Sequence, residues 1–275
     1  MKKKAKERIE IMSSPFGSLR FCRALLATNL RSALALRGSF WLQALFMVLN
    51  NVTFFVFWWV LFARVPTLRG FRLGDMEALF GITAASFGLV QVLAGGVRHL
   101  SRFIDEGALD TLLAQPQPVL LYALGMRSQP SGLGDLASGI GFLALSGQVR
   151  LATLPLVALA VLAAALVFLG CGVAFFSLAF WLPGTETLSR QLWDLTITFS
   201  LYPEPLFGGM LRLLLFTLLP AGLIGFLPLR VVRAATLSDG LLLALGAATY
   251  LALGAWFFGR GLKRYASGSR FGVFG

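Results

Sequence analysis

Few residues of this sequence could take part in acid–base or metal chemistry, and they are widely spread. His99 is the only histidine among the 275 residues, and the two cysteines do not form a metal-binding motif. The neighbours Asp105 and Glu106, and the acids Asp194 and Glu204, could serve a membrane-embedded lipid or glycosyl transferase as general acid and base. The sequence contains no nucleotide-binding loop, zinc-protease motif or nucleophile elbow. We therefore expect no catalytic residue, no metal site and no cofactor bound directly to this chain.

The stretch 98–113 combines charged and apolar residues in a pattern that suits protein binding. Leu100, Phe103 and Ile104 follow helical spacing, and Gly107 can end that helix with a positive φ. A second short helix is expected over 109–113, because two prolines follow and stop it. A short, partly apolar helix at the cytoplasmic side of a membrane domain suits docking into a groove of a soluble partner. The alternative is that the helix only lies on the membrane surface.

The rest of the sequence indicates a membrane domain that positions this loop. Hydrophobic residues make up 57% of the chain and charged residues 13%, and the mean hydropathy is +0.79. An apolar helix of about 20 residues spans a bilayer core of roughly 30 Å. We predict an all-α polytopic membrane protein with about six transmembrane helices, over residues 39–63, 76–97, 131–149, 153–181, 188–206 and 238–259. If 188–206 crosses, 209–229 forms a re-entrant pair broken at Pro220; alternatively, 209–229 itself is the fifth crossing.

The distribution of charge predicts the side of the membrane on which each end lies. The chain has 24 Lys and Arg residues against 12 Asp and Glu, a formal net charge of +12. On the six-crossing topology 17 of the basic residues are cytoplasmic and seven lie outside, which places both termini in the cytoplasm. This pattern fits contact with anionic membrane lipid, and we do not expect nucleic acid as a partner. The chain then divides into an N-terminal segment 1–37 and one transmembrane domain 38–275, with a loop 98–130 and a short basic tail 260–275.

The N-terminal segment predicts an interfacial helix that leads into the first span. Helical spacing puts Arg20, Arg23 and Arg31 within one arc, opposite a broad apolar side that includes Leu25. Such a helix lies in the plane of the membrane surface. Because Asn29 interrupts the apolar side, a solvated basic tail is the alternative.

Polar and small residues within the predicted spans allow two interpretations. Three polar residues of the first two spans could line a translocation path: Asn50, Asn51 and Gln91. Hydrogen bonding between helices explains them equally well. Gly81 and Gly88 suit the second span to close helix packing. We expect Asp135 to cap or anchor one end of the third span.

At the loop the sequence resembles the permease subunits of type-2 ABC exporters, in particular a bacterial six-span subfamily without assigned substrate. The similar pattern is Gly107-Ala108-Leu109-Asp110-Thr111-Leu112-Leu113 followed by Pro116, and later Phe180-Trp181, Leu201-Tyr202-Pro203, Arg212 and the segment 219–228 in the same order. The sequence differs from the pattern at Gln115, a position that is usually basic, and in its short, Gly-rich third span.

The resemblance implies a half-transporter of the bacterial inner membrane that moves an unknown substrate outward and has no ATPase of its own. It would pair with a second permease chain, identical or related, and with two cytoplasmic ABC ATPase subunits that bind ATP and Mg²⁺. The interfacial helix and the 109–113 helix would be the levers that these subunits hold. The implied ATPase-coupling residues are Arg102, Phe103, Asp105, Glu106, Gly107, Leu109, Asp110, Leu112 and Leu113. A third class of function, that of a passive channel or an assembly factor, is a further alternative.

Overall fold

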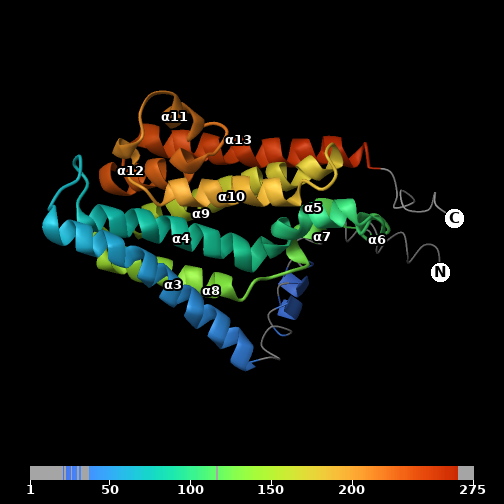
Figure 1. Ribbon diagram of the computed structural model, residues 1–275, viewed down its shortest axis with the longest axis horizontal. Coiled ribbons are helices and arrows are strands. Elements are labelled where there is room, and N and C mark those ends of the chain that lie inside the picture. Colours follow the sequence, from blue (N-terminus) through green and yellow to red (C-terminus); the bar gives the residue numbers. More distant parts are fainter. Residues whose placement is uncertain are drawn as a thin grey trace.

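The computed structural model describes Phe21, residues 23–25, 27–29, Arg31, 37–115 and 117–265. These residues form helices, and the long ones lie side by side along one axis of the molecule (Figure 1). The long helices are α3 (Arg37–Arg64), α4 (Leu73–Ala94), α8 (Ser131–Leu145), α9 (Leu154–Phe176), α10 (Glu186–Ser200) and α13 (Leu237–Leu262). Their order and positions follow the segments predicted as crossings, and the long helix before the last one covers most of 188–206 rather than 209–229.

Short helices gather at the two ends of this bundle (Figure 1). One end, here called the loop end, carries η1 (Gly95–His99), α5 (Leu100–Asp105), α6 (Leu109–Leu113), α7 (Val119–Gly125) and η2 (Ser177–Phe180). The opposite end carries the α3–α4 and α8–α9 turns together with η3 (Glu204–Leu206), α11 (Gly209–Leu214), η4 (Gly222–Phe226) and α12 (Leu227–Ala234). The chain therefore alternates between the two ends, as a polytopic membrane protein does.

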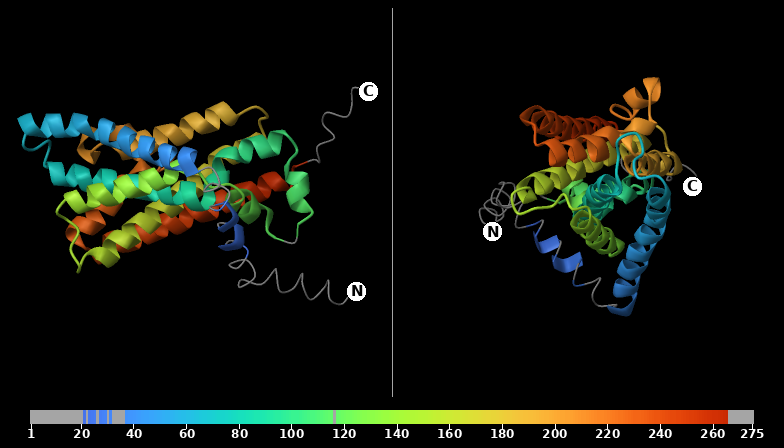
Figure 2. Two further views of the ribbon diagram at one scale, coloured as in Figure 1. Left: turned by 90° about the horizontal axis from the view of Figure 1, so that it is seen from below. Right: turned by 90° about the vertical axis from the view of Figure 1, so that its left-hand side faces the viewer.

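Length and composition mark several of these helices as membrane-spanning. Four helices of the described chain are long and apolar enough to cross a bilayer: Gly38–Arg64, Leu73–Asp105, Leu154–Phe180 and Leu237–Leu262. Ser131–Leu145 is apolar but shorter. Helices α3 and α13 lie at the periphery of the bundle (Figure 2). Most of the apolar stretch of α4 is buried within the protein, whereas most of the residues in the apolar stretches of α3 and α13 are not buried. Such exposed apolar faces suit contact with lipid, and the fold is that of an all-α polytopic membrane protein.

Glycines at seven-residue spacing hold α4 close to α8. Gly81 and Gly88 of α4 face Gly139 and Gly132 of α8, which are also seven residues apart, and Gly74 faces the backbone of Ser146 just after α8. A Cβ atom added at Gly81 would lie 2.8 Å from the carbonyl oxygen of Gly139, so the two backbones are in contact. A seven-residue repeat keeps one face of each helix turned to the other along a left-handed crossing. The prediction that Gly81 and Gly88 form a packing surface is confirmed.

The segment between α10 and α13 folds back into the bundle, as predicted for a re-entrant pair. Helix α11 ends at Leu214, the chain turns over residues 215–220, and the following residues 221–229 are buried against α4 and α9. The hydroxyl of Tyr250 donates a hydrogen bond to the backbone carbonyl of Thr217. Because Tyr250 lies near the middle of α13, the tip of this hairpin reaches deep along the last long helix.

Candidate functional site

The helix predicted from Leu100, Phe103 and Ile104 is present as α5, but its apolar side faces the protein itself. These three side chains are buried, and the helix packs against η2 and the end of α9. In α6, Leu109 and Leu112 are buried in the same hydrophobic core, at 0% and 5% exposure. These apolar residues thus face the protein's own core, because a short helix at the end of a bundle buries its apolar side first, and their role in docking stays a prediction.

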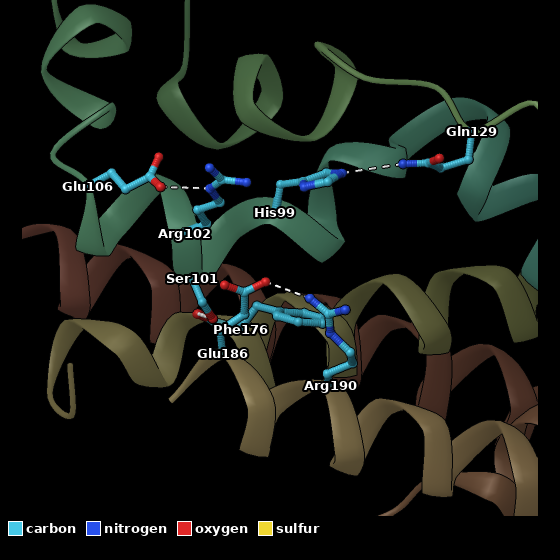
Figure 3. A network of polar contacts seen from close by, with 8 residues as sticks. All are labelled: His99, Ser101, Arg102, Glu106, Gln129, Phe176, Glu186 and Arg190. Carbon is cyan, nitrogen blue, oxygen red and sulfur yellow. Dashed lines mark hydrogen bonds and ion pairs between the residues drawn. The ribbon is translucent and has the colours of Figure 1, made fainter. Parts of the chain in front are cut away.

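The surface that a partner could contact at the loop end is instead mixed and mostly polar. Arg102 and Glu106 are exposed and form an ion pair along one helical turn, with 2.7 Å between Arg102 Nε and Glu106 Oε1 (Figure 3). Leu113 is 48% exposed and is the apolar residue of α6 that faces outward. Thr111 and Gln115 are exposed beside it. Both side chains of this pair are exposed, so their charges are accessible to a partner.

Asp105, Gly107 and Ser101 shape the turn at the end of α5. Gly107 has φ +75°, the left-handed conformation predicted for the end of this helix. Asp105 Oδ2 accepts a hydrogen bond of 3.2 Å from the backbone N–H of Gly184, in the turn that leads into α10. The hydroxyl of Ser101 donates a buried hydrogen bond of 2.8 Å to the carbonyl of Phe176 at the end of α9 (Figure 3). Sequence reasoning missed Ser101, although a serine on the buried side of an amphipathic helix was a usable signal.

The α6 helix is also connected to the end of α13. Asp110 lies close to Tyr265, and burial together with the neighbouring carboxylate raises the pKa of the Tyr265 phenol to about 12. The ring of Phe180 in η2 packs edge-on against Phe258 and against Tyr265. The predicted site residue Asp110 thus connects α6 to the end of α13.

The described part of the N-terminal segment contacts α7 at the same end. The side chain of Asn29 donates hydrogen bonds to the carbonyl of Gly125, at 2.8 Å, and to the hydroxyl of Ser128, at 3.3 Å. The rings of Phe21 and Tyr122 lie 5.2 Å apart. Asn29, which interrupts the apolar stripe in the sequence, is therefore the residue that fixes this segment to the loop. Of the other residues predicted for the interfacial helix, Arg23 and Arg31 are exposed and Leu25 is half-buried, whereas Arg20 lies outside the described residues.

His99 lies at the end of η1. Its Nε2 lies 3.3 Å from Gln129 Nε2, at the point where the loop returns toward α8 (Figure 3). The guanidinium of Arg127 lies 5.9 Å from the ring centre of Phe103, close enough for a cation–π contact. These contacts hold the returning segment of the loop against η1 and α5.

The three predicted path residues occupy different environments. Asn51 is buried, and its Nδ2 donates to Asp135 Oδ1 at 2.9 Å and to Ser138 Oγ at 2.7 Å. Gln91 is 1% exposed, and its Oε1 has no hydrogen-bond partner among the described residues. Asn50 is exposed on the outer side of α3. The structure therefore does not bring the three onto one surface.

Asp135 is not the surface cap that the sequence suggested. Its side chain is 3% exposed, inside the contact between α3 and α8. The sequence pattern misled because Asp135 stands in the first turns of a short helix, where caps are common. A buried carboxyl group in a membrane domain needs donors from its own protein, and Asn51 supplies one.

The acids of the transferase alternative do not converge. Asp194 is exposed on α10, whereas Glu204 pairs with Arg212 near the opposite end from Asp105 and Glu106. Across the part of the chain that the structure describes, no three His, Cys, Asp or Glu side chains come together in a possible metal site. No arrangement of acid and base around a common point supports that alternative.

These features define the class of protein: an integral membrane protein whose apolar helices carry a compact unit of short helices at one end. Residues 48–269 match the family described as ABC-2 family transporter protein, and the chain belongs to this family. Membrane proteins of this family are permease components of ABC transporters, which are typically not catalytic and work with an ABC ATPase subunit. No curated protein and no solved structure matches the chain.

Proposed function

We propose that this chain is the permease subunit of an ABC exporter and that its loop end is where separate ATPase subunits dock. The observation that supports this is the connectivity of the unit formed by α5, α6 and α7. It continues from α4, is hydrogen-bonded to the end of α9 through Ser101, and contacts the α10 turn through Asp105. It also meets the end of α13 through Asp110 and the N-terminal segment through Asn29.

This connectivity lets one small unit move several long helices together. A displacement of α5–α7 by a closing ATPase dimer acts on the ends of α4, α9, α10 and α13 at once, since each is joined to the unit. Packed interfaces change between discrete arrangements rather than bending continuously, so such a push favours one of two states of the membrane domain. Alternating access driven by ATP then needs no nucleotide site on this chain; ATP and Mg²⁺ belong to the ATPase partner.

The orientation follows from the same topology. With the loop end in the cytoplasm, 17 of the 24 basic residues lie on the cytoplasmic side, as the positive-inside rule requires. The N-terminal residues that the structure describes, and Tyr265 near the C-terminus, lie at that end. We propose that the chain crosses the inner membrane of a bacterium six times. The four longest helices provide four of the crossings, and α8 and α10 provide the other two. A second permease chain, identical or related, completes the transporter.

The docking role is tested at Leu113, because Leu112 belongs to the core. Leu113→Asp places a charge on the exposed side of α6 without entering the hydrophobic core. Leu237→Asp is the matched control, since Leu237 is 79% exposed at the opposite end. We expect Leu113→Asp to lower co-purification of the separately encoded ATPase about tenfold, whereas Leu237→Asp leaves it unchanged. Full retention of the ATPase by Leu113→Asp would show that the coupling assignment is wrong.

The ion pair of α5 allows a second, charge-based test. Arg102→Glu removes one docking charge, and the double change Arg102→Glu with Glu106→Arg restores the pair in reverse order. If the pair only stabilises α5, the double variant recovers ATPase binding; if its charges face the partner, binding stays reduced. We expect the second result. ATP-dependent uptake into inside-out vesicles then tests outward transport, and flux without ATP would favour the channel alternative.

Of Asn50, Asn51 and Gln91, we propose Gln91 as the residue that flanks the translocation path, because Asn50 lies on the outer side of α3 and Asn51 is bound to Asp135. The buried Oε1 of Gln91 has no partner among the described residues, so it can accept a hydrogen bond from a passing polar group or water. Gln91→Leu keeps the approximate volume and removes that acceptor. We expect transport to fall while thermal stability is unchanged or slightly higher. Unaltered transport by a stable Gln91→Leu protein would remove this residue from the path.

A further inference from the structure

The opposite end of the bundle contains a polar cavity that the docking and transport roles do not use. It has a volume of about 330 Å³ and is lined by Gly147, Gln148, Arg150, Thr153, Val232 and Arg233. These residues come from the turn between α8 and α9 and from α12, which are far apart in the sequence. Two arginines lining one cavity in a membrane protein indicate an anionic ligand.

Asp75 holds the polar groups of this cavity in place. Its Oδ1 accepts a hydrogen bond of 2.7 Å from Gln148 Nε2 and lies 3.2 Å from Arg233 Nε, and its Oδ2 accepts one of 2.9 Å from the backbone of Arg72. The carboxylate is 6% exposed and neutralises one of the two lining arginines. The site therefore keeps one net positive charge, which matches a phosphodiester with its single negative charge.

Two further groups of the cavity remain available to a ligand. Gln148 Oε1 is buried without a hydrogen-bond partner among the described residues, so it can accept from a hydroxyl group. Arg150 is exposed and forms no ion pair within the described chain. Thr153 precedes the first turn of α9, and the positive end of that 23-residue helix adds to the attraction for an anion.

The surroundings of the cavity favour a lipid over a free phosphate. Three leucines next to it are exposed: Leu145 at 62%, Leu151 at 88% and Leu154 at 46%. They stand at the ends of α8 and α9, where the apolar helices meet the polar turn, and suit contact with acyl chains. We propose that this cavity binds the phosphodiester headgroup of an anionic membrane lipid, with Arg150 and Arg233 at the phosphate and Gln148 at a headgroup hydroxyl.

The test measures the thermal stability of the full-length chain in detergent while phosphatidylglycerol is added. Arg150→Gln is the key variant, because this exposed side chain has no partner in the fold to lose. Arg64→Gln is the matched control, an exposed arginine of the same end that does not line the cavity. We expect the wild type and Arg64→Gln to be stabilised equally, and Arg150→Gln to need about tenfold more lipid for the same shift.

Two comparison ligands separate headgroup, acyl chain and free phosphate. Diacylglycerol has the chains without the phosphate, and glycerol 3-phosphate has the phosphate without the chains. Both should stabilise the wild type far less than phosphatidylglycerol does. The proposal fails if Arg150→Gln responds to phosphatidylglycerol as Arg64→Gln does, if diacylglycerol is equally effective, or if glycerol 3-phosphate alone gives the full shift.

Discussion

Replacing Gly139 by alanine should destabilise this protein, although alanine is normally the better residue in a helix. Gly139 lies in the middle of α8, where the backbone of α4 is in contact with it. An added Cβ atom would be 2.4 Å from the backbone nitrogen of Ala85 and 2.8 Å from its Cα. Ordinary contacts between such atoms are about 3.5 Å or longer, so the two helices must move apart by about 1 Å. Both atoms belong to the backbone, so no side-chain rotation relieves the overlap.

The size of the effect follows from known costs of overpacking. Forcing extra methyl groups into a well-packed contact costs about 1–3 kcal/mol, partly offset by up to about 1 kcal/mol of helix propensity. The net loss is then up to about 2 kcal/mol, which for a chain of this length corresponds to a fall of up to about 8 °C in the unfolding midpoint. Intrinsic fluorescence can report it, because Trp58 and Trp193 are almost fully buried and their emission changes when the bundle opens.

Gly141 provides the control within the same helix. A Cβ atom added there meets nothing within 4 Å, so Gly141→Ala changes helix propensity without changing packing. We expect this variant to unfold at the wild-type midpoint or slightly above it. If Gly139→Ala and Gly141→Ala unfold at the same temperature, the close contact between α4 and α8 does not exist as described.

Three further changes test other contacts. Asn51→Leu removes the donor to the buried Asp135 carboxyl group and should lower stability by about 1–3 kcal/mol, measured by thermal unfolding, whereas adding Asp135→Asn should recover part of the loss. Tyr250→Phe removes the hydrogen bond to the carbonyl of Thr217 and should raise proteolysis within the re-entrant hairpin without changing the global midpoint by more than about 1 kcal/mol. Asn29→Ala should lower ATP-driven transport more than stability, because it loosens the N-terminal segment from the loop; equal transport by this variant would refute the lever assignment.

The long helices could be predicted because their signal is length and apolarity, which a single sequence carries. The short third span, observed as α8, could also be predicted. Fourteen uncharged residues follow Asp135, and two termini on the same side of the membrane require an even number of crossings. The seven-residue spacing of Gly81 and Gly88 marked a packing surface, since only a glycine or another small residue permits such an approach. The partner helix of that surface was not predictable, because many helices could have offered a matching glycine face.

The helices of the loop could be predicted from the sequence, but the direction in which their apolar sides face could not. The spacing of Leu100, Phe103 and Ile104 defines an apolar side, yet it does not state whether that side faces the protein or a partner. Burial is decided by the neighbouring helix ends, here η2 and the end of α9, which are distant in the sequence. As a result, Leu109 and Leu112 belong to the core, whereas Leu113 and the Arg102–Glu106 pair form the available surface.

Polar residues that interrupt an apolar stripe turn out to mark contacts between elements in this protein. Asn29 reaches α7, Ser101 reaches the end of α9, and Asn51 reaches α8, in each case by donating a hydrogen bond to another element. The reason is physical: a polar group on a helix face that packs against another element is shielded from water, so it is retained where that element accepts its hydrogen bond. Ser189 follows the same rule, since its hydroxyl donates at 2.7 Å to the carbonyl of Phe175 and joins α10 to α9. Such interruptions therefore predict which helices move together, and three of these four lie at the loop end, where a docking ATPase would act.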